Sequence, residues 1–150
     1  MKLRVNGIES EVAVDDQDAF LHVLRNKLSL RGAHYGCGAE HCGACMVAID
    51  GAPVPACTYP AAQAEGKSIT TVEGLAEDGA VVRAFEAEQA GQCGYCLPGI
   101  LISVQALLWR NPTPKRGDIL AALEPHLCRC GAHPSILRAV ERAVAEIVQT

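Results

Sequence analysis

Eight cysteines are the residues of this 150-residue sequence that are best suited to chemistry, and they fall into two sets of four. Four thiolates placed close together bind an iron–sulfur cluster or a zinc ion, and cysteines also pair as disulfides. The N-terminal residues alternate between polar and apolar types and lack the continuous apolar run of a signal peptide. We therefore expect a cytoplasmic protein, in which reducing conditions disfavour structural disulfides.

The first set has the spacing C-x4-C-x2-C followed by a distant cysteine, which is typical of plant-type [2Fe–2S] sites. Glycines beside these cysteines lack the Cβ atoms that would block a cluster, and backbone N–H groups of the loop are expected to point at the sulfurs. Zinc is the alternative, although its ligands usually come as C-x2-C pairs. A Rieske centre needs two histidine ligands, so we interpret His41 as a solvent-facing loop residue. The set comprises Cys37, Cys42, Cys45 and Cys57, and the glycines are Gly36, Gly38 and Gly43.

The second set lies in two short segments, QCGYC and LCRC, each between two expected helices. Two such loops, each with two thiolates, can enclose a second cluster, whose negative charge is favoured near helix N-termini. The C-x-C spacing disfavours zinc, and the C-x2-C-x2-C run of [4Fe–4S] proteins does not occur in the sequence. The sequence therefore predicts two [2Fe–2S] clusters that use every cysteine. The second set comprises Cys93, Cys96, Cys128 and Cys130.

Two contrasting patterns of secondary structure are expected to position these cysteines. In the N-terminal half, Asn6-Gly7 and Asp50-Gly51 separate apolar runs and predict hairpins with type I′ turns. Residues 68–72 predict a further strand, and a helix is expected over 20–28 with Asp16 or Asp18 as its N-cap. The C-terminal half predicts four helices, over 81–90 with a stop at Gly91, over 98–109, over 116–123, and after Pro134. The fold class is therefore α+β, with one unit over residues 1–74 and a helical unit over 75–150.

Composition argues against several other classes of protein. The net charge is -4 and the basic residues are scattered, which disfavours a nucleic-acid partner. The longest apolar stretch, residues 99–109, is too short to cross a membrane and contains Ser103 and Gln105. No nucleotide-binding motif occurs, and no residue is a credible nucleophile or general base. We therefore expect no catalytic residue in this chain.

The motifs GCGxxxCGAC, DGxPVxxC, TTVEGL, QCGYCxPG, ALLxxNPxP and LCRCG occur in this order. Together they resemble the small iron–sulfur subunit of the molybdenum hydroxylases, the xanthine oxidase superfamily, over essentially the whole chain. The LCRCG-x-H variant at residues 127–133 is similar to that of isoquinoline and nicotinate dehydrogenase small subunits. This variant favours an enzyme that acts on N-heteroaromatic compounds or aldehydes.

The resemblance implies an N-terminal β-grasp ferredoxin domain and a C-terminal four-helix domain, each with one cluster. The chain would pass electrons from a molybdopterin centre on a large partner subunit, where the catalytic site lies, to an external acceptor. Gln92 and Cys130 match residues that contact the molybdopterin cofactor, for example molybdopterin cytosine dinucleotide. The helical-domain cluster would lie nearer that cofactor, and the ferredoxin-domain cluster would face an FAD subunit or a c-type cytochrome. The alternative is a free-standing two-cluster ferredoxin, which has no need of the QCGYC and LCRCG loops.

Three residues depart from the family pattern. Glu40 stands in the first cysteine loop where the family usually has glycine, and a positive φ at this position would cost on the order of 1 kcal/mol. His126 replaces a frequent asparagine, and Leu97 replaces a frequent threonine. Neither of the last two alters the thiolate ligands.

Overall fold

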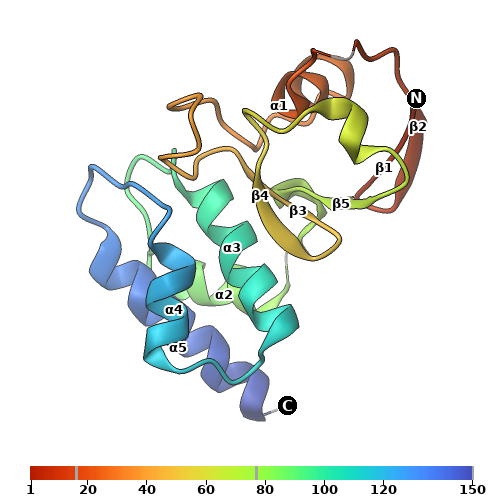
Figure 1. Ribbon diagram of the computed structural model, residues 1–150. Helices are drawn as coiled ribbons and strands as arrows, with labels where there is room; N and C mark the ends of the chain where they lie inside the picture. Colours follow the sequence, from red (N-terminus) through yellow and green to blue (C-terminus); the bar gives the residue numbers. More distant parts are fainter. Residues whose placement is uncertain (16, 77, 150) are drawn as a thin grey trace.

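The computed structural model describes residues 1–15, 17–76 and 78–149. Strands and one short helix form the N-terminal half, and four helices form the C-terminal half, which confirms the predicted α+β class (Figure 1). The strands are β1 Lys2–Val5, β2 Ile8–Glu11, β3 Met46–Ile49, β4 Ala52–Pro55 and β5 Ser68–Thr70. The α-helices are α1 Phe20–His22, α2 Ala80–Ala87, α3 Leu97–Arg110, α4 Arg116–Leu123 and α5 His133–Gln149. A π-helical turn Val23–Lys27 extends α1, and 3-10 turns span Ala61–Ala64 and Val72–Gly74.

The five strands form one mixed sheet in the order β2-β1-β5-β3-β4. The pair β1–β5 is parallel, and the other neighbouring pairs are antiparallel. Asn6 and Gly7 have φ values of 52° and 79°, and Asp50 and Gly51 have 49° and 80°. Both hairpin turns therefore have the two left-handed residues of the predicted type I′ geometry.

The core of the N-terminal half lies between the sheet and α1 with its π-helical extension. Phe20, Leu24, Val47 and Ile69 are all almost completely buried there. This arrangement of a mixed sheet around one short helix is the expected β-grasp fold. Burial of each such side chain stabilises this half of the fold by roughly 1.5–3 kcal/mol.

Two predicted boundaries in this half were wrong. The N-cap of α1 is Ala19, without a side-chain cap, whereas the Asp18 carboxylate lies 2.9 Å from Lys27 Nζ. The other predicted cap, Asp16, lies outside the described residues. Strand β5 ends two residues early because the Asn6 side chain accepts the Thr71 N–H at 2.9 Å, which takes that donor from the sheet.

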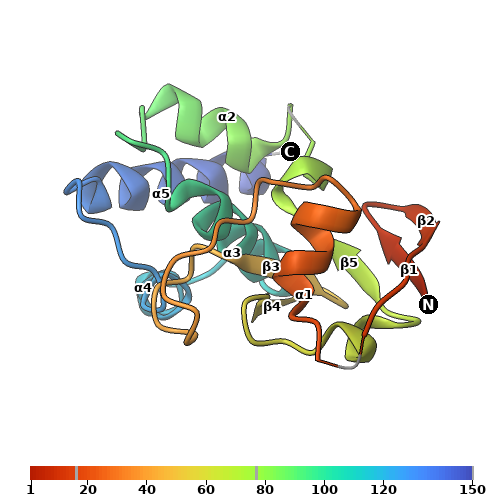
Figure 2. The same cartoon turned by 90° about the horizontal axis from the view of Figure 1, so that it is seen from above.

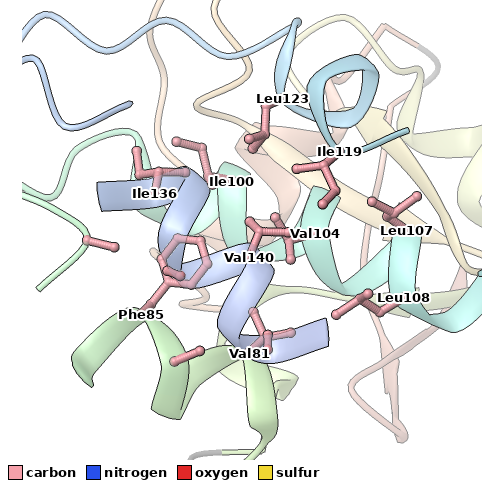
Figure 3. Packing of buried hydrophobic residues seen from close by; sticks show 14 of the residues in the cluster. Val81, Phe85, Ile100, Val104, Leu107, Leu108, Ile119, Leu123, Ile136 and Val140 are labelled. Carbon is pink, nitrogen blue, oxygen red and sulfur yellow. The ribbon is translucent and has the colours of Figure 1, made fainter. Parts of the chain in front are cut away.

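The helical half has its own core, in which α2, α3, α4 and α5 meet (Figure 3). Phe85 from α2, Val104 from α3 and Val140 from α5 pack at its centre. The predicted bounds of α4 are confirmed, but α2 ends at Ala87, because Gln89 takes the left-handed conformation expected for Gly91. No helix within the described residues is both long and apolar enough to cross a membrane.

Strand β3 joins the two halves because both of its faces are buried. Val47 and Ile49 point into the ferredoxin-like core, whereas Met46 and Ala48 pack against Ile102 of α3. Both views place α3 between the sheet and the α2–α5 pair (Figures 1 and 2). Helix α3 is thus apolar on two sides, which fixes the helical half against the sheet.

Candidate iron–sulfur centres

The first cysteine loop connects the helical segment after α1 to β3 and has no regular secondary structure. A Cβ atom on Gly36 would lie 2.6 Å from Cys42 Sγ, so this position accommodates the sulfur only without a side chain. Gly43 has a φ of 71°, which favours glycine between two of the cysteines. Of the three glycines, Gly36 therefore makes room for a thiol, whereas a Cβ atom on Gly38 or Gly43 would meet Tyr35 or His126 instead.

Backbone N–H groups of this loop point at the sulfur atoms, as expected. Ala39 and His41 donate to Cys37 Sγ at 3.4 and 3.2 Å, and Cys37 N–H donates to Cys42 Sγ at 3.4 Å. The N–H groups of Ala39 and His41 are the main reason that the pKa of Cys37 falls from 9.0 to about 6. This loop therefore stabilises thiolate, the form that binds metal.

The hairpin of β3 and β4 brings the other two cysteines of the first set together. Cys45 lies directly before β3, and the Ala56 N–H donates to its carbonyl oxygen at 3.2 Å, which places Cys57 opposite. Cys45 is 2% exposed, and burial raises its pKa to about 12, with the adjacent Cys57 thiol acting in the same direction. The first set thus consists of a Cys37–Cys42 pair on an exposed loop and a more buried Cys45–Cys57 pair.

The second set is formed by the α2–α3 and α4–α5 loops, at the N-terminal ends of α3 and α5. Cys93 interacts with Cys130, and its pKa is lowered first by the Tyr95 N–H. Cys96 is the N-cap of α3 and interacts with Cys128, and burial raises the pKa of Cys96 to about 11. Burial would also raise the pKa of Cys128, but backbone N–H groups beginning with that of Ala132 outweigh it and lower the pKa.

The eight free thiols are therefore arranged as four pairs, two in each half. A [2Fe–2S] cluster has two iron atoms, each bound by two thiolates, and matches two pairs. Zinc instead needs four ligands that converge on one point. The donor set and its pairing fit two binuclear clusters better than two zinc ions.

The two cysteine sets are neighbours in space. Leu127 N–H donates to the Cys42 carbonyl oxygen at 3.1 Å, which connects the first loop to the residue before Cys128. A cavity of about 210 Å³ lies between the loops, and its walls include cysteines from both sets. A second contact is so close that a Cβ atom on Gly99 of α3 would lie 2.0 Å from the Gly43 carbonyl oxygen.

His126 lies at this junction, where sequence reasoning assigned it no role. It is 3% exposed, and its Nε2 lies 2.8 Å from Ser103 Oγ. Its Nδ1 has no partner among the described residues, and burial lowers its pKa to about 4. The one sequence feature that could have placed His126 near the second set is its position two residues before Cys128.

The two residues predicted to contact a molybdopterin cofactor lie on the accessible side of the second set. Gln92 is exposed, directly precedes Cys93, and lines a groove of about 360 Å³ with Phe85 and Leu97. Cys130 is partly buried and interacts with Cys93. The structure therefore brings both residues to one end of the helical half. Glu40 has a φ of 63°, so the condition under which it would be strained is met, and its carboxylate accepts the Thr58 hydroxyl.

A β-grasp unit and a four-helix unit, each with two cysteine pairs, define the class of two-centre iron–sulfur proteins. Residues 3–76 match the 2Fe-2S iron-sulfur cluster binding domain family, and residues 71–141 match the [2Fe-2S] binding domain family. The chain is 48% identical over 146 residues to one of the subunits of nicotinate dehydrogenase from Pseudomonas putida, which covers 95% of this chain and 93% of that protein. It is 40% identical over 145 residues to the alpha subunit of isoquinoline 1-oxidoreductase from Brevundimonas diminuta, with 95% of each covered. Quinoline 2-oxidoreductase from Pseudomonas putida 86 superimposes with a TM-score of 0.92 at 35% identity, over 99% of this chain and 94% of that chain.

The chain belongs to the small iron–sulfur subunits of the molybdenum hydroxylases, in the xanthine oxidase superfamily. Its role is electron transfer within an oxidoreductase whose catalytic site is on a partner chain. Several relatives are named as subunits of larger oxidoreductases. The resemblance found in the motifs is thereby confirmed.

Proposed function

We propose that the eight cysteines bind two [2Fe–2S] clusters, one in each of two units at residues 1–74 and 75–150. When bound, a cluster supplies one-electron redox chemistry. The chain's own contribution is to hold thiolates in pairs, to direct N–H groups at Cys37 and Cys42, and to exclude water from Cys45 and Cys96. The proposed ligands are Cys37, Cys42, Cys45 and Cys57 in the first unit, and Cys93, Cys96, Cys128 and Cys130 in the second.

The observation that carries the electron-transfer role is the hydrogen bond from Leu127 N–H to the Cys42 carbonyl oxygen at 3.1 Å. Cys42 is a proposed ligand of one cluster, and Leu127 is covalently bonded to Cys128, a proposed ligand of the other. One short hydrogen bond therefore completes a continuous path of bonds between the two sites. A chain that held two unrelated metal centres would have no need of this connection.

We infer that the second set lies nearer the molybdopterin cofactor, for example molybdopterin cytosine dinucleotide, of the large subunit. The exposed amide of Gln92 offers two donors and one acceptor to a flat heterocycle, and Cys130 lies on the same side. Leu127 and Tyr95 are 65% and 50% exposed beside this set. Large exposed apolar side chains of this kind mark protein interfaces, which favours a subunit over a free-standing ferredoxin.

The first set then faces the electron acceptor, which we propose to be an FAD subunit or a c-type cytochrome. Its Cys37 is exposed, so that this end of the site is accessible to a second partner. The relatives named for nicotinate, isoquinoline and quinoline favour an N-heteroaromatic substrate for the complex, with aldehydes as the second class to test.

The test replaces Gln92 with alanine in the complex and measures iron content and substrate-dependent dye reduction on the same sample. An unpaired buried polar group costs about 1–3 kcal/mol, so activity should fall roughly tenfold while iron content stays unchanged. Gln105→Ala, which removes the same amide from the middle of α3, is the matched control and should keep full activity. Full activity of Gln92→Ala would contradict the cofactor contact. Parallel loss of iron would instead make Gln92 a support of the cluster.

A further inference from the structure

A further contact between the two cysteine loops lies apart from the Cys42–Leu127 hydrogen bond and the Gly43–Gly99 approach and involves three ring-bearing residues. The ring of His34 stacks on that of Tyr95, with centroids 4.4 Å apart and planes inclined by 20°. His34 Nδ1 donates to the Tyr95 carbonyl oxygen at 2.8 Å, and the Tyr95 hydroxyl donates to the Tyr35 carbonyl oxygen at 2.5 Å. We call His34, Tyr35 and Tyr95 the aromatic clasp.

Both sides of the clasp are adjacent to proposed ligands. His34 and Tyr35 directly precede Gly36 and Cys37, whereas Tyr95 lies between Cys93 and Cys96. The contact therefore acts between the two loops themselves and not between remote surfaces of the two halves.

The clasp is also fixed to the first loop. His34 N–H donates to the Ala44 carbonyl oxygen at 3.0 Å, on the far side of that loop. The Tyr35 hydroxyl lies against Gly38, where a Cβ atom would approach it to 2.4 Å. A movement of Tyr95 relative to His34 would therefore be a movement of one cysteine loop relative to the other.

The clasp attaches a different part of the first loop from the other contacts. The Cys42–Leu127 hydrogen bond and the close approach of Gly43 to Gly99 both involve the C-terminal part of that loop. The clasp attaches the N-terminal part, at His34 and Tyr35, and so opposes rotation of the loop about the other two contacts.

We propose that the aromatic clasp is a positioning device that holds the two cluster loops at a fixed separation and orientation, and so sets the rate of electron transfer between the clusters. The inference rests on the proposed assignment of the cysteines as cluster ligands. In this step, one electron would pass from the second-set cluster to the first-set cluster, so that the former would be oxidised and the latter reduced. No proton would move, and no bond would form or break. The rate of this step falls exponentially with separation, so that a small displacement has a large effect.

The experiment compares His34→Ala and Tyr95→Leu in the iron-loaded full chain. The first readout is the spin–spin splitting in the EPR spectrum of the fully reduced protein, which depends steeply on the distance and angle between clusters. The second is the rate of inter-cluster electron transfer after pulsed reduction. Tyr95→Phe keeps the ring stack and loses the hydroxyl hydrogen bond, and His22→Ala removes an exposed imidazole from α1 as the matched control.

We expect both disrupting variants to keep the iron content of the wild type, to change the splitting, and to slow inter-cluster transfer roughly tenfold to a hundredfold. Tyr95→Phe should lie closer to the wild type, and His22→Ala should match it. Unchanged splitting and rate in iron-replete His34→Ala would overturn the proposal. If Tyr95→Leu loses second-set iron, His34→Ala decides the question, because His34 is outside both ligand motifs. Loss of first-set iron from His34→Ala would overturn the proposal by making His34 a support of that cluster. A wild-type chain without two clusters would instead refute the ligand assignment.

Discussion

Replacing Gly99 with alanine probes the close approach of the two halves. The new Cβ would lie 2.0 Å from the carbonyl oxygen and 3.0 Å from the carbonyl carbon of Gly43. The oxygen must therefore retreat by about 1 Å or more to reach a tolerable contact. It is a backbone atom between Cys42 and Cys45 and accepts the Met46 N–H at 3.1 Å, so the strain reaches the first cysteine loop.

The expected cost follows from two destabilising contributions and one stabilising contribution. Overpacking costs about 1–3 kcal/mol, and loss of the Met46 hydrogen bond adds about 1 kcal/mol. Replacing glycine in a helix by alanine returns roughly 0.5–1 kcal/mol, because less backbone entropy is lost on folding. Gly99→Ala should thus reduce the free energy of unfolding by about 1–3 kcal/mol.

Gly117→Ala is the matched control because it makes the same substitution in α4, where a Cβ atom would meet nothing within 4 Å. This variant should gain roughly 0.5–1 kcal/mol. Denaturant unfolding of the iron-loaded chain, followed by circular dichroism and visible absorbance, gives both values. A Gly99→Ala protein as stable as Gly117→Ala would refute the close packing of α3 on the first cysteine loop.

Three further substitutions test the first unit. Glu40→Gly should be about 0.5–1 kcal/mol more stable than Glu40→Ala, because both variants lose the Thr58 hydrogen bond and only glycine relieves the positive φ, and equal denaturation midpoints would contradict this. Burial opposes ionisation of Glu73, but hydrogen bonds from the Thr71 hydroxyl and the Gly32 N–H hold its pKa below 4.5. The ionised Glu73 therefore stabilises the fold above pH 4.5, and this stabilisation is lost as the pH falls through the lowered pKa of the folded protein. Glu73→Gln should lose on the order of 1 kcal/mol or less at neutral pH and flatten this acid dependence of the unfolding midpoint, whereas an unchanged acid slope would refute the role of Glu73. Cys42→Ser should remove about half of the iron and leave the second-set EPR signal, and loss of both signals from a folded chain would mean that the sets are interdependent.

Local features of the sequence were sufficient to predict several parts of the fold. Asn6-Gly7 and Asp50-Gly51 predicted both hairpins, because their turn geometry needs two left-handed residues that these dipeptides tolerate. The same is true of α4, which was predicted to end before Pro125.

Features that depend on tertiary contacts were not predictable in this way. Helix α2 ends at Ala87 because Gln89 is left-handed, and β5 ends at Thr70 because the Asn6 side chain accepts the Thr71 N–H. Local propensity specifies neither conformation. The contacts of His34 with Tyr95 and of Gly43 with Gly99 join residues more than fifty positions apart. The cysteine spacing indicated two sites, but only the folded chain places them side by side.

The most direct test of the central claim is the metal content of the purified full chain. Two [2Fe–2S] clusters predict about four iron and four acid-labile sulfide per chain with negligible zinc. The spectrum should be that of [2Fe–2S] clusters, and the reduced protein should show two EPR signals. Two iron per chain from one fully occupied site, or stoichiometric zinc without sulfide, would contradict the account.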